Sequence, residues 1–164
     1  MSDYTATYLN DHLAGSVAAL DLLDHLAQQH AGTDLADFFV QLHADITADR
    51  DELTALMARL NVPSSRVRKA VAWVAEKFAR LKMRLDDPDD GPLRLLESLE
   101  AVAVGIEGTR ALWRALGAAS ELAPSLRGPN YARLERRAEE QRDRLEPLRL
   151  DAARAALTRE LLPL

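Results

Sequence analysis

The sequence contains no cysteine, and only 5% of its 164 residues are aromatic. Without cysteine the chain can form neither disulfides nor thiolate-based catalytic or zinc sites. No uncharged apolar run approaches the roughly 18 residues that a membrane span needs, and no basic and apolar segments typical of a secretory signal are visible near the start. With a net charge of -5, we expect a mildly acidic, cytoplasmic protein.

Glycine and proline are also scarce, with seven of each, and most of them separate long segments rich in Ala, Leu, Arg and Glu. These four residues are strong helix formers, and no segment shows the period-two alternation of a half-buried strand. The sequence therefore predicts one all-α domain over residues 1–164. Helices are expected at about residues 3–29, 34–61, 66–84, 92–117 and 130–160.

Capping and helix-breaking residues set these boundaries. Thr33 is placed to cap the second helix, and Pro63 follows its end. Pro92 suits the first position of the fourth helix, and Gly117 is expected to end it. Pro147 lies inside the last predicted helix, where a proline is expected to produce a kink.

Apolar residues recur at spacings of three and four, which is typical of the buried seam of a helical bundle. The predicted seam of the first two long helices is Thr5, Tyr8, His12, Gly15, Ala19, Leu22 and Leu26, then Phe39, Leu42, Ile46, Asp49, Leu53, Leu56 and Leu60. The other two long helices contribute Leu95, Leu99, Val102, Ile106, Thr109, Trp113 and Leu116, then Tyr131, Leu134, Ala138, Gln141, Leu145, Leu148 and Ala152. The short first connection and the long second one predict an up-down-down-up four-helix bundle with an extra helix in the crossover.

Four of these seam positions carry polar side chains: His12, Asp49, Gln141 and, more mildly, Thr109. A buried carboxylate without a partner costs several kcal/mol, so we expect Asp49 to have one. The four side chains either form a satisfied hydrogen-bond cluster that fixes the helix register, or line a site. We favour the cluster, because no charge-rich constellation accompanies them.

The architecture resembles the ferritin-like superfamily, and so do short stretches of the sequence. LHADITADRDELTALMARL resembles the second helix of ferritin-like proteins, and RAEEQRDRLEPLRLDAA resembles the fourth. YLNDHLAG and VGIEGTRALWRAL, taken with these, resemble a bacterial branch of that superfamily. The resemblance covers roughly residues 3–61 and 92–158.

Active members of that superfamily hold a di-iron or di-manganese centre with a Glu on each of two helices and a Glu-x-x-His on each of the others. This chain contains no Glu-x-x-His. Alignment to the family pattern places these residues at the ligand positions: His12, Ile46, Asp49, Gly105, Ala138 and Gln141. A shift of one helical turn would recruit Glu100, Glu107 or Glu140 instead.

The resemblance therefore implies the fold without the metal centre, and we expect no cofactor. An altered iron or manganese site is the alternative, with His12, Asp49, Glu100 and Glu107 as weak candidate ligands. Gly15, Gly105 and Gly108 are interpreted as small residues that let helices approach closely.

Two charged segments offer further hypotheses. The predicted helix at 66–84 carries a basic face with Arg66, Arg68, Lys69, Lys77 and Arg80, which could bind phosphates, an anionic membrane or an acidic partner. We favour packing of this helix on the acidic bundle, so nucleic-acid and membrane binding are not expected. The run from 133 to 144 is interpreted as a solvated face laced with ion pairs.

Taken together, these features favour a non-enzymatic structural or protein-interaction role. Self-association is a further hypothesis, because Phe38, Trp73, Phe78, Leu161 and Leu162 exceed what one bundle must bury. The competing hypotheses are a metal-binding or redox protein with an altered centre, and attachment to an anionic membrane or nucleic acid through the 66–84 helix.

Overall fold

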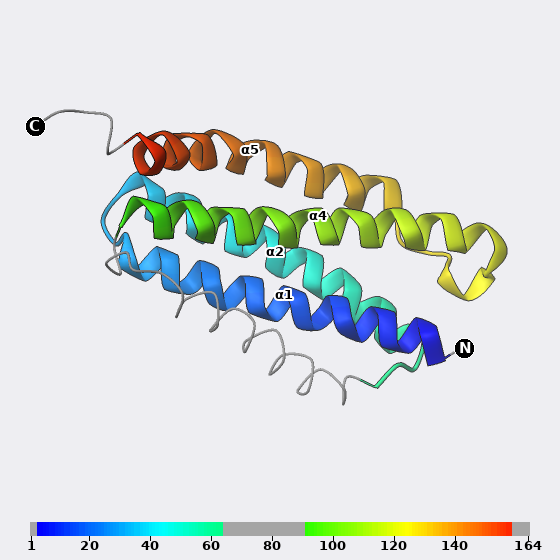
Figure 1. Ribbon diagram of the computed structural model, residues 1–164. Coiled ribbons are helices and arrows are strands. Elements are labelled where there is room, and N and C mark those ends of the chain that lie inside the picture. Colours follow the sequence, from blue (N-terminus) through cyan, green and yellow to red (C-terminus); the bar gives the residue numbers. More distant parts are fainter. Residues whose placement is uncertain (1–2, 64–90, 159–164) are drawn as a thin grey trace, which may run out of the picture.

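The computed structural model describes residues 3–63 and 91–158, which are largely helical (Figure 1). Its elements are α1 (Asp3–Gln29), α2 (Asp34–Arg59), α4 (Pro92–Leu122), the short 3-10 helix η2 (Pro124–Leu126) and α5 (Tyr131–Leu157). These two ranges contain no strand, which confirms the all-α prediction for this part of the chain. The helix predicted at 66–84 lies outside the described residues.

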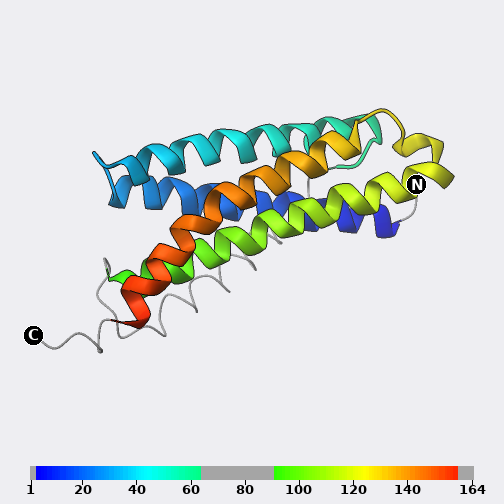
Figure 2. The same cartoon turned by 90° about the horizontal axis from the view of Figure 1, so that it is seen from above.

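The four long helices form two antiparallel hairpins. Figure 1 shows α2 returning alongside α1, α4 running in the same direction as α2, and α5 returning alongside α4, which is the predicted up-down-down-up order. The packing is most extensive within the pairs α1–α2 and α4–α5. Between the hairpins, α1 packs on α4, whereas the backbones of α2 and α5 approach each other only in places. Figure 2 shows α5 veering away from α2 toward its C-terminal end.

The boundaries of α2 and α4 differ only partly from those predicted. The Thr33 hydroxyl caps α2 by accepting a hydrogen bond from the Ala36 backbone N–H at 3.3 Å. The last residue of α2 is Arg59, slightly before the predicted end. Gly117 does not end α4, which continues to Leu122. One glycine costs a helix only about 1 kcal/mol, and the two alanines that follow Gly117 favour continuation of the helix.

The last helix begins and ends close to its predicted limits. The Asn130 side chain caps α5 by accepting a hydrogen bond from the Arg133 backbone N–H at 3.0 Å. Pro147 lies inside α5, and the helix continues past it to Leu157. The proline therefore removes one backbone donor without ending the helix.

Two apolar clusters fill the core. The buried members of the first cluster are Leu20, Leu23, Leu26, Phe39, Leu42, Ile46, Leu96, Leu99, Val102, Ile106, Ala138, Leu145 and Ala152. Those of the second cluster are Leu9, Leu13, Leu53, Leu56, Met57, Val62, Leu112, Trp113, Leu116, Leu126, Tyr131 and Leu134. Each cluster draws on all four long helices. None of the described helices combines the length and apolarity required to cross a membrane.

The predicted seam is confirmed along most of α2, α4 and α5 and at Leu26 of α1, but it is wrong along the rest of α1. There the buried residues include Leu9, Leu13, Leu20 and Leu23, whereas Tyr8 is 37% exposed. The seam of α1 thus lies about one residue further along than predicted. Leucines at the shifted positions bury more apolar surface than the Thr, Tyr, His and Gly of the predicted stripe, so the helix turns that face inward.

Phe38 needs no second copy of the chain to shield it. Its side chain is half-buried and packs against the first apolar cluster. This removes Phe38 from the argument for self-association. The other residues of that argument, Trp73, Phe78, Leu161 and Leu162, lie outside the described residues.

The predicted role of the helix glycines is wrong in part. A Cβ at Gly105 would lie 3.8 Å from the Ala19 Cβ, which is ordinary van der Waals contact. A Cβ at Gly15 or Gly108 would meet no atom of the described residues within 4 Å. In this part of the chain, close approach of the helices does not require these glycines.

We therefore predict that Gly108→Ala raises the free energy of unfolding by about 0.5–1 kcal/mol, because alanine restricts the unfolded chain more than glycine does. Gly128→Ala is a matched control for which we expect the opposite effect on stability. Gly128 has a φ of +134°, a backbone conformation that residues with a Cβ rarely adopt, and an added Cβ would also meet the Arg59 guanidinium. That substitution should lower stability by about 1–3 kcal/mol. Chemical denaturation of both variants checks the pair, and a loss of stability in Gly108→Ala would contradict the expectation.

Candidate functional site

Asp49 lies near the middle of α2, on the side facing the core. Ile46, one turn earlier, belongs to the first apolar cluster, and Leu53, one turn later, belongs to the second. Residues three or four apart share one face of a helix, so burying these two apolar side chains carries the carboxylate inward with them. Asp49 is 3% exposed as a result. A carboxylate in that position must find hydrogen-bond donors.

The donors come from one turn of α5. Arg137 Nε donates to Asp49 Oδ1 at 2.8 Å, and Arg137 Nη2 donates to the same oxygen. Gln141 Nε2 donates to Asp49 Oδ2 at 2.7 Å. The prediction that Asp49 has a partner is confirmed, and so is the convergence of Asp49 and Gln141. We refer to Asp49, Arg137 and Gln141 as the Asp49 network.

Burial and pairing act on the Asp49 carboxyl in opposite directions. Burial raises the pKa of Asp49 above its ordinary value of 3.8, and the neighbouring Asp45 carboxylate raises it as well. The hydrogen bonds from Gln141 and Arg137 and the charge of Arg137 lower the pKa, but by less. The ionised form is therefore held in the core at a cost that its partners only partly offset.

Gln141 retains one unused hydrogen-bonding atom. The residue is 1% exposed, and its Oε1 accepts no hydrogen bond from the described residues. An ionised carboxylate only accepts hydrogen bonds, so Asp49 in that form cannot supply the missing donor. The Asp49 network is thus incompletely satisfied on the side of Gln141.

Arg137 connects this interior site to the surface. Its side chain is 24% exposed and forms part of a shallow depression. The other residues that line the depression are Asp45, Glu140, Asp143 and Arg144. The guanidinium therefore lies between solvent and the buried carboxylate.

Two more ion pairs join α2 to α5 on either side of the Asp49 network. Arg144 pairs with Asp45, and Arg133 Nη2 lies 2.8 Å from Glu52 Oε1. In all three pairs the acid is on α2 and the arginine is on α5. The solvated ionic face predicted for residues 133–144 is confirmed for these two flanking arginines, but Arg137 turns inward instead.

The structure does not bring His12 into the Asp49 network. The His12 ring packs edge-on against Tyr8, with ring centroids 4.6 Å apart, and burial lowers the pKa of His12. No hydrogen bond or ion pair links it to Asp49 in the part of the chain that the structure describes. The shifted seam of α1 explains this, because His12 lies beside the buried stripe rather than within it.

The remaining candidates are engaged on their own helices or at the surface. Thr109 Oγ1 donates to the Gly105 carbonyl at 3.2 Å. Glu107 pairs with Arg110 at 3.1 Å. Glu100 pairs with Arg149 at 3.3 Å. Neither glutamate enters the Asp49 network.

The candidate ligand residues, as the structure places them, fit a di-metal centre poorly. Within residues 3–63 and 91–158 there is no group of three or more His, Cys, Asp or Glu side chains that could hold a metal ion. Both oxygens of Asp49 are already engaged, one of them by a cation. Iron and manganese centres of the ferritin-like kind need several carboxylates to offset the metal charge, and a guanidinium in the same place opposes a cation.

The basic face predicted at 66–84, with Arg66, Arg68, Lys69, Lys77 and Arg80, lies outside the described residues. The hypotheses of membrane, phosphate or nucleic-acid attachment through it stay predictions.

Arg137 is the member of the Asp49 network that the sequence analysis missed. It lies in a run of charged residues, which suggested a solvated face. The available signal was its position one turn before Gln141 on the same helix, together with the need of Asp49 for a cationic partner. Arginine can reach a buried carboxylate from beside a seam because its long stem packs along apolar neighbours.

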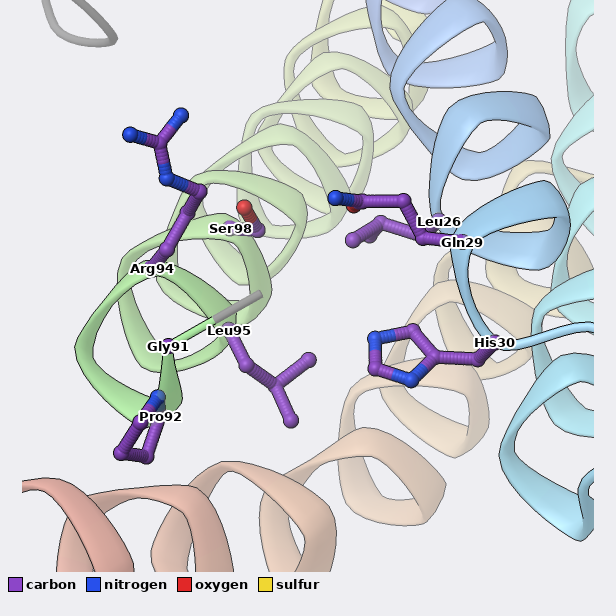
Figure 3. A pocket seen from close by; sticks show the side chains of 8 residues that line it. All are labelled: Leu26, Gln29, His30, Gly91, Pro92, Arg94, Leu95 and Ser98. Atoms are coloured by element: carbon purple, nitrogen blue, oxygen red, sulfur yellow. The ribbon is translucent and has the colours of Figure 1, made fainter. Parts of the chain in front are cut away.

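A separate pocket of about 230 Å³ lies where the end of α1 meets the start of α4. Its polar residues are Gln29, His30, Arg94 and Ser98. Figure 3 shows Gln29 extending toward Ser98 and the His30 ring facing Leu95, whereas the Arg94 guanidinium points away. Gln29 and Arg94 both make further interactions of their own.

Removal of the Arg137 side chain should lower the stability of the fold, because it leaves a buried carboxylate without its cationic partner. We expect Arg137→Ala to lower the free energy of unfolding by about 2–3 kcal/mol, and the exposed neighbour Arg136→Ala to change it by less than about 0.5 kcal/mol. In the double variant with Asp49→Ala, the loss should be smaller than the sum of the two single losses. Additive losses in urea denaturation would show that the pair is not energetically coupled.

The raised pKa of Asp49 also predicts a pH dependence of stability. A carboxyl whose pKa is higher in the folded state binds its proton more tightly there, so its contribution to stability is greatest at low pH and falls as pH rises from the ordinary value of 3.8 through the raised one. Asp49→Asn removes this titration. The stability of the unmodified protein relative to Asp49→Asn should therefore decline across that window, and a rise would mean that pairing outweighs burial.

Comparison of the chain with protein-family models gives no match, and neither a curated protein nor a solved structure is similar enough to be matched. The resemblance to ferritin-like proteins accordingly stays a prediction from the sequence. What the site can do has to follow from its own geometry and charge.

Proposed function

We propose that this chain is a non-catalytic bundle of ferritin-like architecture with a structural or protein-interaction role. In this proposal the Asp49 network occupies the level of the bundle where metal-binding members of the superfamily hold their ions. The hydrogen bonds of Asp49 carry the proposal. Oδ1 is taken by Arg137 and Oδ2 by Gln141, so the buried carboxylate is committed to holding α2 and α5 together.

The distribution of charge supports an interaction role. Residues 3–63 contain ten acidic residues and two arginines, a net charge of -8, whereas residues 91–158 contain ten acidic residues and eleven arginines, a net charge of +1. Asp45, Asp49 and Glu52 of the first segment are paired with arginines of α5, but the acids that remain still outnumber its two arginines. This excess of negative charge favours partners with basic surfaces. A homo-oligomer remains a second form of the same proposal.

Metal loading tests the proposal directly. Protein purified without chelator and then exposed anaerobically to Fe(II) or Mn(II) should retain far less than one ion per chain by elemental analysis, because Arg137 opposes a cation at Asp49. Asp49→Ala should retain the same small amount, which would identify it as nonspecific.

Near-stoichiometric metal that is lost in Asp49→Ala would contradict the proposal. It would instead favour the altered iron or manganese centre, and oxygen-consumption measurements would follow. Metal retained equally by both proteins would place any ion away from Asp49 and leave the network as proposed.

A further inference from the structure

Protonation of Asp49 would allow Gln141 to satisfy its unused acceptor, provided that the amide turns over so that Oε1 faces the carboxyl group. Gln141 Oε1 is buried and accepts no hydrogen bond from the described residues. Asp49 Oδ2, which accepts from Nε2 of the same amide, could gain a hydrogen on protonation and become a donor. Protonation would also remove the negative charge that holds Arg137.

The Arg137 side chain has a second possible position, in the depression at the surface. The depression to which its side chain contributes is also lined by the carboxylates of Asp45, Glu140 and Asp143. An arginine side chain is long and flexible, so a change of rotamer carries its head between neighbouring acceptors without moving the backbone. Two of these carboxylates are already engaged, Asp45 by Arg144 and Asp143 by Arg142. The guanidinium thus has an inward partner in Asp49 and, within the depression, Glu140 as its outward one.

The charged groups around Asp49 come from two helices. Arg137 of α5 and Asp45 of α2 act on its carboxyl directly, and Glu140, Asp143 and Arg144 of α5 line the adjoining depression. From the described residues of α1 and α4, no charged side chain forms an ion pair or hydrogen bond with Asp49. The electrostatic balance at Asp49 is therefore decided across the α2–α5 contact.

We propose that Arg137 is a pH-operated switch, which turns inward onto Asp49 when that carboxylate is ionised and outward into the depression when Asp49 is protonated. The proton comes from solvent, and the guanidinium keeps its own charge in both positions. Outward movement loosens one of the three ion pairs that link α2 to α5 and places a cation at the surface. Burial raises the pKa of Asp49 above its ordinary value, so the protonated form is reached at a higher pH than that value alone would allow.

The switch is separate from the proposed function, because it rests on the arginine and the surface carboxylates and not on whether the bundle binds metal. Its test therefore uses no metal. Full-length protein labelled with ¹³C and ¹⁵N is titrated from about pH 7.5 to about pH 4. The Asp49 carboxyl ¹³C shift and the Arg137 Nε ¹⁵N shift are followed by NMR, with circular dichroism recorded alongside.

Asp49 should titrate above its ordinary value of 3.8, and the Arg137 signal should move with the same midpoint. Protection of the Arg137 Nε–H from solvent exchange, measured against the exposed Arg136 at the same pH, should be lost below that midpoint. Helical signal should persist throughout.

Two substitutions on the same helix separate the switch from general loss of charge. Asp49→Asn is neutral at every pH, so Arg137 should be unprotected already at neutral pH. Asp45→Asn removes a neighbouring charge and leaves Asp49 ionised, so Arg137 should stay protected at neutral pH.

Protection of Arg137 that persists below the Asp49 midpoint, or in Asp49→Asn, would overturn the switch. Loss of protection that coincides with loss of helical signal would overturn it as well, since unfolding would then release the arginine.

Discussion

The hydrogen bonds that Asp49 accepts from Arg137 and Gln141 join the two hairpins where their backbones stay apart. Within each hairpin, leucine-rich faces pack directly and need no polar link. Between α2 and α5 the distance is spanned by long side chains, and the central link is buried. The network also lies where the two apolar clusters meet, between Ile46 and Leu53 along α2. The contact between α2 and α5 therefore contains a buried polar network, and the alignment of these two helices depends on satisfying it.

The distribution of charge and the hydrogen bonds of Asp49 both favour the packing of α2 against α5. The α1–α2 segment is strongly acidic, whereas the segment holding α4 and α5 is close to neutral and rich in arginine. Each of the three ion pairs across the α2–α5 contact has its acid on α2 and its arginine on α5. The two exposed pairs add little individually in water, but they have the same polarity as the buried one. Together they disfavour arrangements in which α2 would face another acidic helix.

Much of the fold could be predicted because the spacing of apolar residues along a helix indicates which of its faces is buried. Each of the helices α2, α4 and α5 has one clear apolar stripe, and most of the predicted seam is buried. The first helix carries leucines on two adjacent stripes, so spacing alone did not choose between them, and His12 was assigned to the wrong one. Asp49 and Gln141 were found because they interrupt a stripe. Arg137 lies beside the stripe among other charges, and only the orientation of α5 against α2 shows that it turns inward.

A buried ion pair is an expensive way to hold two helices together. Apolar residues of similar volume are often equally stabilising or better by about 1–4 kcal/mol, so stability alone does not account for the Asp49 network. Register does. Leucine stripes still interdigitate when one helix slides by a turn, because the next leucine takes the place of the last. Sliding α5 by one turn would instead bring Leu145 to the position of Gln141 and leave the Asp49 carboxylate short of a donor. The cost of that unpaired oxygen selects one alignment of α5 on α2, and so fixes how the two hairpins are joined.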